Sequence, residues 1–484
     1  MNPLPITQKV CRTWSLFGAP AVLPSPPRLI LHFSPRMLRD KFSPSKLQGC
    51  LGGCCSADAA DAGLSGPPDS RLNFYSFHCS TSMFSPATFL QLAALVSVAA
   101  AAPSNVTRTA TAKRATCTVN SVSSASNLKS CTDVIIEGFT VPSGHTLNIE
   151  VCCLATSSLF DARFDHPLHQ AASGASVTLA GDLVFAKTSS AGPLITFNTN
   201  NINFNGGDHN INGNGAAYWD GKGTNGGSTK PHPFVKFVFA HFILHTARAH
   251  SGRRFKGSGT FSFVTVLNSP AQAISVGTSG ATVIERVTVD NSAGASLGHN
   301  TDGFDVSASD VTIAQCTVIN QDDCVAVNKG NNILVEDTTC TGSHGISIGS
   351  IASGHAVTNF KAARNTITGG LYGLRIKVDA NAKNAQVSGV TYEANVVSGI
   401  SDYGVLITQS YPANDGTPGT GGPISNVAFI GGTTTVAVDS GAMSVVIDCG
   451  ACSGNWDFSG LDVTSAGKGH KIAANNAKIS GGHY

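Results

Sequence analysis

Apolar and polar residues alternate in five short segments of the second half of the chain. The segments read GFDVS, CVAVN, GISIG, GLRIK and GVLIT, and they begin at Gly303, Cys324, Gly345, Gly373 and Gly404. Their starts lie 21, 21, 28 and 31 residues apart, and the second and fourth residues of each are apolar. Alternation with period two predicts strands, and a repeat of this length predicts stacked coils that each contribute the same strand.

A second β pattern accompanies these strands in every coil. It covers residues 281–291, 309–320, 331–342, 355–369, 383–399 and 422–436. Because crossovers between parallel strands of one sheet are right-handed almost without exception, we predict an all-β fold, a single-domain right-handed parallel β-helix. Similar patterns at 175–186 and 193–212 extend the coils, and residues 117–131 are expected to form a short N-terminal capping helix over the exposed sheet edge.

The composition agrees with this solenoid. Gly contributes 52 residues and charged residues only 12%, which suits many tight turns, while four Met and scarce helical periodicity argue against a helical protein. A net charge of +2 gives no reason to expect nucleic-acid or membrane binding. After residue 103 no apolar run is long enough to span a bilayer.

The amino-terminal part has a different character. Residues 1–82 hold five of the 14 cysteines and no strand repeat, and we interpret them as a non-native extension. Residues 83–102 form an apolar run that ends in small residues, and this pattern predicts a secretory signal peptide. The positive amino-terminal region that such signals usually have is missing. The alternative is a buried core helix. The dibasic pair Lys113-Arg114 predicts a propeptide at 103–114, unless the pair occurs by chance.

The mature catalytic domain is then expected at 115–484, with two stretches that interrupt its repeat. One lies near 151–170 and contains Cys152-Cys153; the other lies near 238–255 and carries three His and three Arg. Our hypothesis is that both are untranslated sequence read as protein, and the alternative is that they are real surface insertions.

Seven cysteines lie outside these stretches and the extension. In a secreted chain they should mostly pair. Local loops suggest the pairs Cys117–Cys131, Cys324–Cys340 and Cys449–Cys452. Cys316 remains, at the inward position that Val287 occupies one coil earlier, which favours a buried thiol over a reactive one.

Polar residues gather just before the five aligned strands. They are Asp302, Asp322, Asp323, His344, Tyr372 and Tyr403, and Arg375 and Lys377 occupy outward positions within the fourth strand. Successive rungs lie roughly 4.8 Å apart, so these side chains should share one solvent-facing patch.

Adjacent aspartates repel one another and raise at least one pKa, which is the arrangement glycoside hydrolysis needs in order to have both an acid and a base. Alternatively, the aspartates only form a turn or bind a cation. Arg375 and Lys377 could bind an anionic substrate or form a salt-bridge network. Tyr403 could stack on a sugar ring or fill the core.

Four motifs carry a resemblance to a known family. NTD at 300–302, QDDC at 321–324, GSHG at 342–345 and RIK at 375–377 resemble, in order, the signatures of glycoside hydrolase family 28. The set is most similar to its secreted fungal endopolygalacturonases, and Tyr403-Gly404 and YWDG at 218–221 also match. The resemblance covers about 115–484 apart from the two interrupting stretches.

The resemblance implies roles for individual residues. Asp322 would be the general acid, Asp302 and Asp323 would activate the attacking water with inversion, and His344 would tune the acid. The substrate-binding residues it implies are Arg375, Lys377, Tyr403, Asn300 and Gln321. It implies a secreted monomer that acts on polygalacturonate or pectin, with no cofactor and no metal.

The chain departs from the family pattern in three places. Ser343 stands where Gly is more common, Gln409-Ser410-Tyr411 lacks the usual acidic middle residue, and 471–484 lacks the usual cysteine pair. Other readings remain open: an exopolygalacturonase, a rhamnogalacturonase, a Ca²⁺-dependent pectate lyase, a non-catalytic polysaccharide-binding β-helix, or a chain inactivated by 238–255.

We predict that a shortened chain, beginning at Ala115 and lacking 151–170 and 238–255, will be secreted in higher yield and be more active than the full chain. The second stretch would expose Phe239, Phe242 and neighbouring apolar residues, which promotes aggregation. Soluble yield, melting temperature and release of reducing ends from polygalacturonate should be compared for both forms. Equal values would show that the stretches are harmless insertions.

Overall fold

The computed structural model describes residues 55–60, 74–79, 115–151, 174–198, 201–238 and 259–484. The chain divides into two compact units, 1–110 and 111–484. In the first, β1 (Cys55–Ala60) and β2 (Phe74–Cys79) pair antiparallel. The predicted signal peptide and propeptide lie outside the described residues, as do the two interrupting stretches except for Val151 and Val238.

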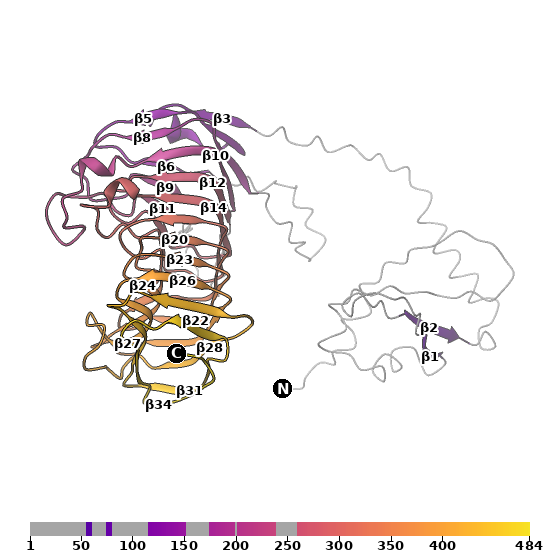
Figure 1. Cartoon of the computed structure of the whole chain (residues 1–484). Helices are drawn as coiled ribbons and strands as arrows, with labels where there is room; N and C mark the ends of the chain where they lie inside the picture. The colour runs from indigo at the N-terminus through magenta and orange to yellow at the C-terminus, as the bar shows by residue number, and fades with distance from the viewer. Residues whose placement is uncertain (1–54, 61–73, 80–114, 152–173, 199–200, 239–258) are drawn as a thin grey trace, which may run out of the picture. The chain divides into compact units, whose positions relative to one another are not determined.

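The second unit is the predicted parallel β-helix, a column of coils that runs from β3 at one end to β34 at the other (Figure 1). One face is an eleven-stranded parallel sheet. Its strands are β6 (Leu147–Ile149), β9 (Ile195–Asn198), β11 (Val235–Val238), β13 (Ile274–Val276), β15 (Phe304–Val306), β18 (Val325–Val327), β21 (Ile346–Ile351), β24 (Tyr372–Asp379), β27 (Tyr403–Tyr411), β30 (Met443–Asp448) and β33 (His470–Ala473).

The register of this sheet matches the alignment that the sequence predicts. Phe304 lies opposite Val325, Val325 opposite Ile346, Ile346 opposite Leu374, and Leu374 opposite Val405. All five side chains are buried in one apolar core. Along each strand, the residues that alternate with these inward apolar residues therefore point away from the core, toward the outer face of the sheet.

The other faces of each coil come from the second β pattern. Towards the amino end these strands are β3 (Thr116–Val119), β4 (Asp133–Ile136), β5 (Phe139–Val141), β7 (Ala175–Leu179), β8 (Leu183–Phe185), β10 (Ile202–Asn212), β12 (Gly259–Leu267) and β14 (Thr282–Asp290). Next come β16 (Val311–Ala314), β17 (Thr317–Ile319), β19 (Gly330–Glu336), β20 (Thr339–Thr341), β22 (Ala356–Ala363), β23 (Thr366–Thr368), β25 (Gln386–Glu393) and β26 (Val396–Ile400). The last are β28 (Ile424–Phe429), β29 (Thr434–Val438), β31 (Cys452–Asp457), β32 (Leu461–Ser465) and β34 (Asn476–Ser480).

Left-handed residues divide this second pattern into two strands in the coils from β16 to β26. Gln315, Asp337, Arg364 and Ala394 have φ of 55°, 50°, 55° and 51°, and each lies between the two strands of its coil. Each of the two strands pairs in parallel with its equivalent in the next coil, as β16 does with β19 and β17 with β20. The inward side chains of both strands remain in the same core.

Aromatic side chains stack from coil to coil inside the column. The rings of Phe204 and Phe261 stack with centroids 4.5 Å apart, and those of Tyr392 and Phe429 stack with centroids 4.9 Å apart. Such contacts fix the vertical register of the coils, because each ring fits against the equivalent position of the next coil.

The predicted capping helix is not confirmed. In its place the structure has one short 3-10 helix, η3 (Ser124–Asn127). The serines explain this, because the Ser124 hydroxyl accepts from the backbone N–H groups of Asn120 and Ser121 and competes with α-helical hydrogen bonding. Two further 3-10 helices are η4 (Gly215–Ala217) and η5 (Ser292–Gly294).

The three suggested disulfides are present, at Cys117–Cys131, Cys324–Cys340 and Cys449–Cys452. Cys316 is buried, and Val287 is its neighbour one coil earlier, since the adjoining residues Thr288 and Thr317 are register partners. Burial raises the pKa of its thiol to about 12, so it is inert. Within the described ranges, no helix has the length and apolar character that a membrane span requires.

Candidate active site

Most of the predicted site residues meet on the outer face of the eleven-stranded sheet. An open cleft of about 440 Å³ lies there, beside the turns that precede β15, β18 and β21. Its lining includes Asn300, Asp302, Asp305, Asp322, Asp323, His344, Tyr372, Arg375, Lys377, Tyr411 and Asn414. The cleft therefore combines four carboxyl groups with two cations.

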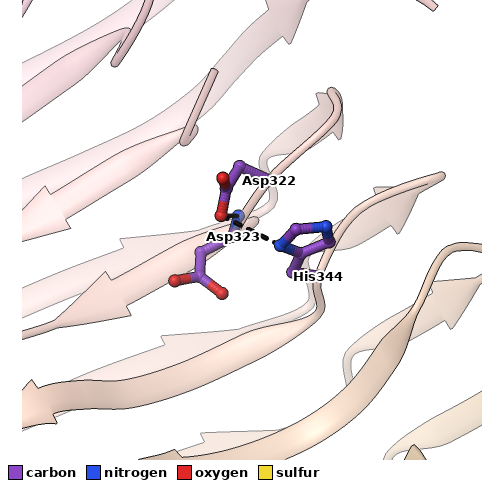
Figure 2. Close-up of side chains that lie close together, drawn as sticks. All are labelled: Asp322, Asp323 and His344. Atoms are coloured by element: carbon purple, nitrogen blue, oxygen red, sulfur yellow. Dashed lines mark hydrogen bonds and ion pairs between the residues drawn. The ribbon is translucent and has the colours of Figure 1, made fainter. Parts of the chain in front are cut away.

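Asp322 and His344 form the outer part of the cluster (Figure 2). His344 Nδ1 lies 3.0 Å from Asp322 Oδ1, and their side chains are 23% and 17% exposed. The backbone N–H of Asp323 also donates to Asp322 Oδ1, at 2.8 Å, and Asn300 Nδ2 donates to Asp322 Oδ2, at 3.1 Å. Asp322 is thus held in one orientation while it still faces the cleft.

Asp323 lies deeper and points away from this pair (Figure 2). Its side chain is 1% exposed and accepts from Arg375 Nη2 at 2.6 Å and from Lys377 Nζ at 2.7 Å. Ser347 Oγ donates to the same carboxylate at 2.7 Å. Burial works to raise the pKa of Asp323, but the two cations and these hydrogen bonds outweigh it and hold the pKa below its usual value. Asp323 is therefore ionised.

Asp302 and Asp305 have the opposite tendency. Burial raises the pKa of Asp302 well above its usual value, and the charges of neighbouring aspartates raise it further. Burial, followed by the charges of Asp323 and Asp322, raises the pKa of Asp305 to about 7. Among the described residues, Asp302 Oδ1 has no hydrogen-bond partner. The cleft thus holds carboxyl groups of very different acidity, as acid–base chemistry requires.

Aromatic rings line the side of the cleft towards the carboxyl end. The Arg375 guanidinium lies 4.1 Å from the centroid of the Tyr372 ring, and His344 meets that ring edge-on at 5.4 Å. Tyr403 stacks on Tyr372 with centroids 6.0 Å apart and is not among the lining residues of the cleft. Lys377 Nζ lies 5.4 Å from the centroid of the Tyr411 ring, which does line it.

Gln321 is the other predicted residue that the cleft does not include. Its amide Nε2 donates to the backbone oxygen of Asn291 at 2.8 Å, and its Oε1 accepts from Thr301 Oγ1 at 3.0 Å. These bonds tie the turn before β15 to the turn before β18. The side chain therefore stabilises the backbone that carries Asp302 and Asp322.

Sequence reasoning missed Asp305, Tyr411 and Asn414. Asp305 is the central residue of GFDVS and points outward, a signal that was available once the alternation was recognised. Tyr411 ends β27 and Asn414 lies in the loop beyond it, where no strand pattern indicates direction. Asn414 Nδ2 donates to the Tyr372 hydroxyl at 2.9 Å.

The departure at Gln409-Ser410-Tyr411 has a local compensation. Ser410 Oγ donates to Asp448 on the neighbouring strand β30, and Asp448 also accepts from the backbone N–H of Gly416 at 3.1 Å. A carboxylate from the next coil therefore supports the loop that follows β27.

Asp322, Asp323 and His344 also form a possible metal-ligand set, with one ligand atom of each within 4.8 Å of the others. The surroundings do not suit a divalent cation, because both Asp323 oxygens already accept from cationic groups. An added ion would meet the charges of Arg375 and Lys377 at close range. We therefore assign no step to a metal.

Comparisons with known proteins point to one enzyme family. The model of the family described as glycosyl hydrolases family 28 matches residues 131–481. Endopolygalacturonase A of Aspergillus niger is 40% identical over 381 residues, which are 77% of this chain and 92% of that protein. The structure is similar to endopolygalacturonase I from Stereum purpureum complexed with two galacturonates, with 50% identity, a TM-score of 0.66, and coverage of 76% of this chain and 100% of that chain. The fold alone is shared with an endo-xylogalacturonan hydrolase from Aspergillus tubingensis, at 22% identity and a TM-score of 0.51, over 76% of this chain and 100% of that chain.

We predict that Asp305→Asn will change how stability depends on pH. Folded Asp305 keeps its proton up to about pH 7, whereas an ordinary carboxyl group loses it near 3.8. The folded state then binds more protons between these values, so the wild-type free energy of unfolding falls as pH rises through this window. The variant lacks this term, and its melting temperature relative to wild type should rise from pH 4 to pH 7.

The matched control is Asp439→Asn, at an exposed aspartate outside the cleft. It should follow the wild-type pH dependence. Identical pH dependence of the melting temperature in wild type and Asp305→Asn would show that Asp305 has an ordinary acidity.

Proposed function

The chain belongs to family 28 of the glycosyl hydrolases, and we propose that it is an endo-acting polygalacturonase. It hydrolyses α-1,4-galacturonosyl linkages in polygalacturonate with inversion at the anomeric carbon. The observation that carries this proposal is the contact of one ionised carboxylate, Asp323, with two cations, beside a second aspartate held by an imidazole. Acid, base and anion-binding groups are then present in one cleft.

Asp322 acts as the general acid. Arg375 and Lys377 donate to Asp323, whereas among the described residues the Asp322 carboxyl group contacts His344, Asn300 and the backbone of Asp323. The contacts from His344 and Asn300 hold its carboxyl group at the cleft surface. From there it protonates the glycosidic oxygen as the bond to the leaving sugar breaks.

Asp323 and Asp302 act on the attacking water. Asp323 supplies the negative charge, because its cationic partners keep it ionised, and the Asp302 carboxyl group lines the same cleft. A water held between them transfers a proton to this pair of carboxylates as its oxygen attacks the anomeric carbon and the bond to the leaving sugar breaks. Activity should weaken in acid as Asp302 becomes protonated, since its pKa is raised.

Arg375 and Lys377 each contact Asp323, and they also bind the carboxylate of the substrate. Arg375 Nε donates a hydrogen bond to Ser347 Oγ at 3.1 Å, and Arg375 Nη2 donates one to Asp323. Guanidinium has five N–H donors and ammonium has three, so both groups retain donors on the cleft side. The relatives named as endopolygalacturonases, and a structure holding two galacturonates, support this choice of substrate.

We further propose that the enzyme is secreted and works as a monomer. Three disulfides in the β-helix support an oxidising compartment, because such bonds are rare in the cytosol. Light scattering of the secreted protein would test the monomeric state.

Asp322→Asn should abolish hydrolysis with little change in fold or in substrate affinity. Asparagine keeps the shape of the side chain but cannot donate the proton, and general acid catalysis contributes about 10²–10⁴-fold. The measurement is kcat for reducing-end release from polygalacturonate, with exposed Asp208→Asn as the control. More than about a tenth of wild-type kcat in Asp322→Asn would exclude Asp322 from this role.

Lys377→Ala and Arg375→Ala should mainly raise KM for polygalacturonate. Hydrogen bonds that involve charged groups contribute about 1.5–3 kcal/mol each. Each loss also leaves Asp323 with one cation fewer, so its pKa should rise and the acid limb of the kcat profile should move to higher pH. The role in carboxylate binding would be wrong if wild type cleaved fully methyl-esterified pectin as well as the free acid.

Chelator should leave the activity unchanged, and the products should lack the ultraviolet absorbance of unsaturated sugars. A Ca²⁺-dependent lyase would differ in both respects. The two cations on Asp323 favour the hydrolase. Loss of activity in EDTA that added Ca²⁺ restores would instead support the lyase.

A further inference from the structure

Asn300 connects the general acid to a loop from an earlier coil. On one side of the amide, Nδ2 donates to Asp322 Oδ2 at 3.1 Å. On the other side, Oδ1 accepts from the backbone N–H of Thr224 at 3.0 Å, from Thr224 Oγ1 at 3.2 Å and from Asn225 Nδ2 at 3.2 Å. Three donors on the carbonyl oxygen exclude the flipped amide, which would present an N–H group to them.

The loop itself, residues 220–230, has an internal ion pair that orders it. Lys230 Nζ donates to Asp220 Oδ1 at 2.8 Å, and the Lys230 side chain is only 2% exposed. Asp220 Oδ2 accepts from the backbone N–H of Ser228 at 2.8 Å, and Oδ1 accepts from that of Lys222 at 3.1 Å. The hydrogen bond from Lys230 is the main reason why the pKa of Asp220 lies below its usual value.

Glycines allow the close approach at both ends of this arrangement. A Cβ at Gly223 would lie 2.2 Å from Asn300 Oδ1, and a Cβ at Gly227 would lie 2.0 Å from Asp220 Oδ2. Both residues have positive φ, 54° and 74°. Backbone therefore contacts both polar groups directly, which only glycine permits at these positions.

We propose that loop 220–230 positions the general acid through Asn300. The inference rests on the proposed role of Asp322. Thr224 and the pair of Asp220 with Lys230 are positioning residues: they contact Asn300 or the loop, and the structure gives them no contact with Asp322. Their effect is to keep Asn300 Nδ2 directed at Asp322 Oδ2, so that the acid faces the glycosidic oxygen in one orientation.

The experiment compares two leaving groups. Thr224→Val removes one donor to Asn300 at almost constant volume, and Asp220→Ala loosens the loop from its far end. Each variant is assayed on polygalacturonate and on an oligogalacturonide with a dinitrophenyl leaving group, which departs without protonation. General acid catalysis contributes about 10²–10⁴-fold, and a misdirected acid loses part of it, so kcat on polygalacturonate should fall on the order of tenfold with KM unchanged.

The same variants should match wild type on the dinitrophenyl substrate, because no acid is needed there. Thr224→Ser, which keeps the hydroxyl donor, should behave as wild type on both. The control Thr358→Val removes a similar hydrogen bond, from Thr358 Oγ1 to Asn331 Oδ1, on a strand of another face, and should not change kcat.

Two results would overturn the inference. One is wild-type kcat on polygalacturonate in both variants, and the other is an equal loss on both substrates, which would indicate a structural role only. Asp322→Asn is measured alongside. If it shows the leaving-group dependence while the loop variants do not, the proposed acid stands and only the loop's role is refuted. If it retains full activity on polygalacturonate, the proposed function fails first.

Discussion

The site depends on the burial of one carboxylate. Removing an ionised group from water costs several kcal/mol unless cations and hydrogen bonds replace the solvent. For Asp323 these come from two later coils: Ser347 lies on β21, and Arg375 and Lys377 lie on β24. The cluster therefore exists only if three successive coils stack in one register. A shift of one residue in β24 would turn Ile376 outward and both cations into the apolar core.

The same register gives the aspartates of the cleft different pKa values. Asp323 meets two cations and is ionised, whereas Asp302 and Asp305 are buried beside other carboxylates and retain protons to higher pH. Identical side chains thus acquire different acidities from their places in the stack. Water activation needs this difference, because the low pKa of Asp323 keeps one carboxylate charged beside buried neighbours that hold their protons more strongly.

The sequence predicts most of this architecture because a solenoid repeats local rules. Inward apolar residues indicate the strands, and residues just before or between them must reach the outer face. This reasoning correctly placed Asp302, Asp323 and Lys377 in one cleft. The capping helix is not confirmed, because serine side chains bind the backbone there and the chain forms only the short 3-10 helix η3.

Features outside the repeat could not be predicted in this way. The direction of the Tyr411 side chain depends on how β27 ends. The orientation of the Gln321 amide depends on its hydrogen bonds to Asn291 and Thr301 in neighbouring turns. The link from Thr224 to Asn300 spans 76 residues and joins a loop to a turn. No period in the sequence indicates such a contact, since loops carry no regular direction.

The most direct test of the account is the configuration of the first product. Proton NMR of a fresh digest of oligogalacturonate distinguishes the anomers of the newly formed reducing end before they interconvert. Direct attack of a water held by Asp302 and Asp323 predicts that the β-anomer appears first from the α-linked substrate. Initial release of the α-anomer would require a covalent intermediate on one of the carboxylates and would contradict the account.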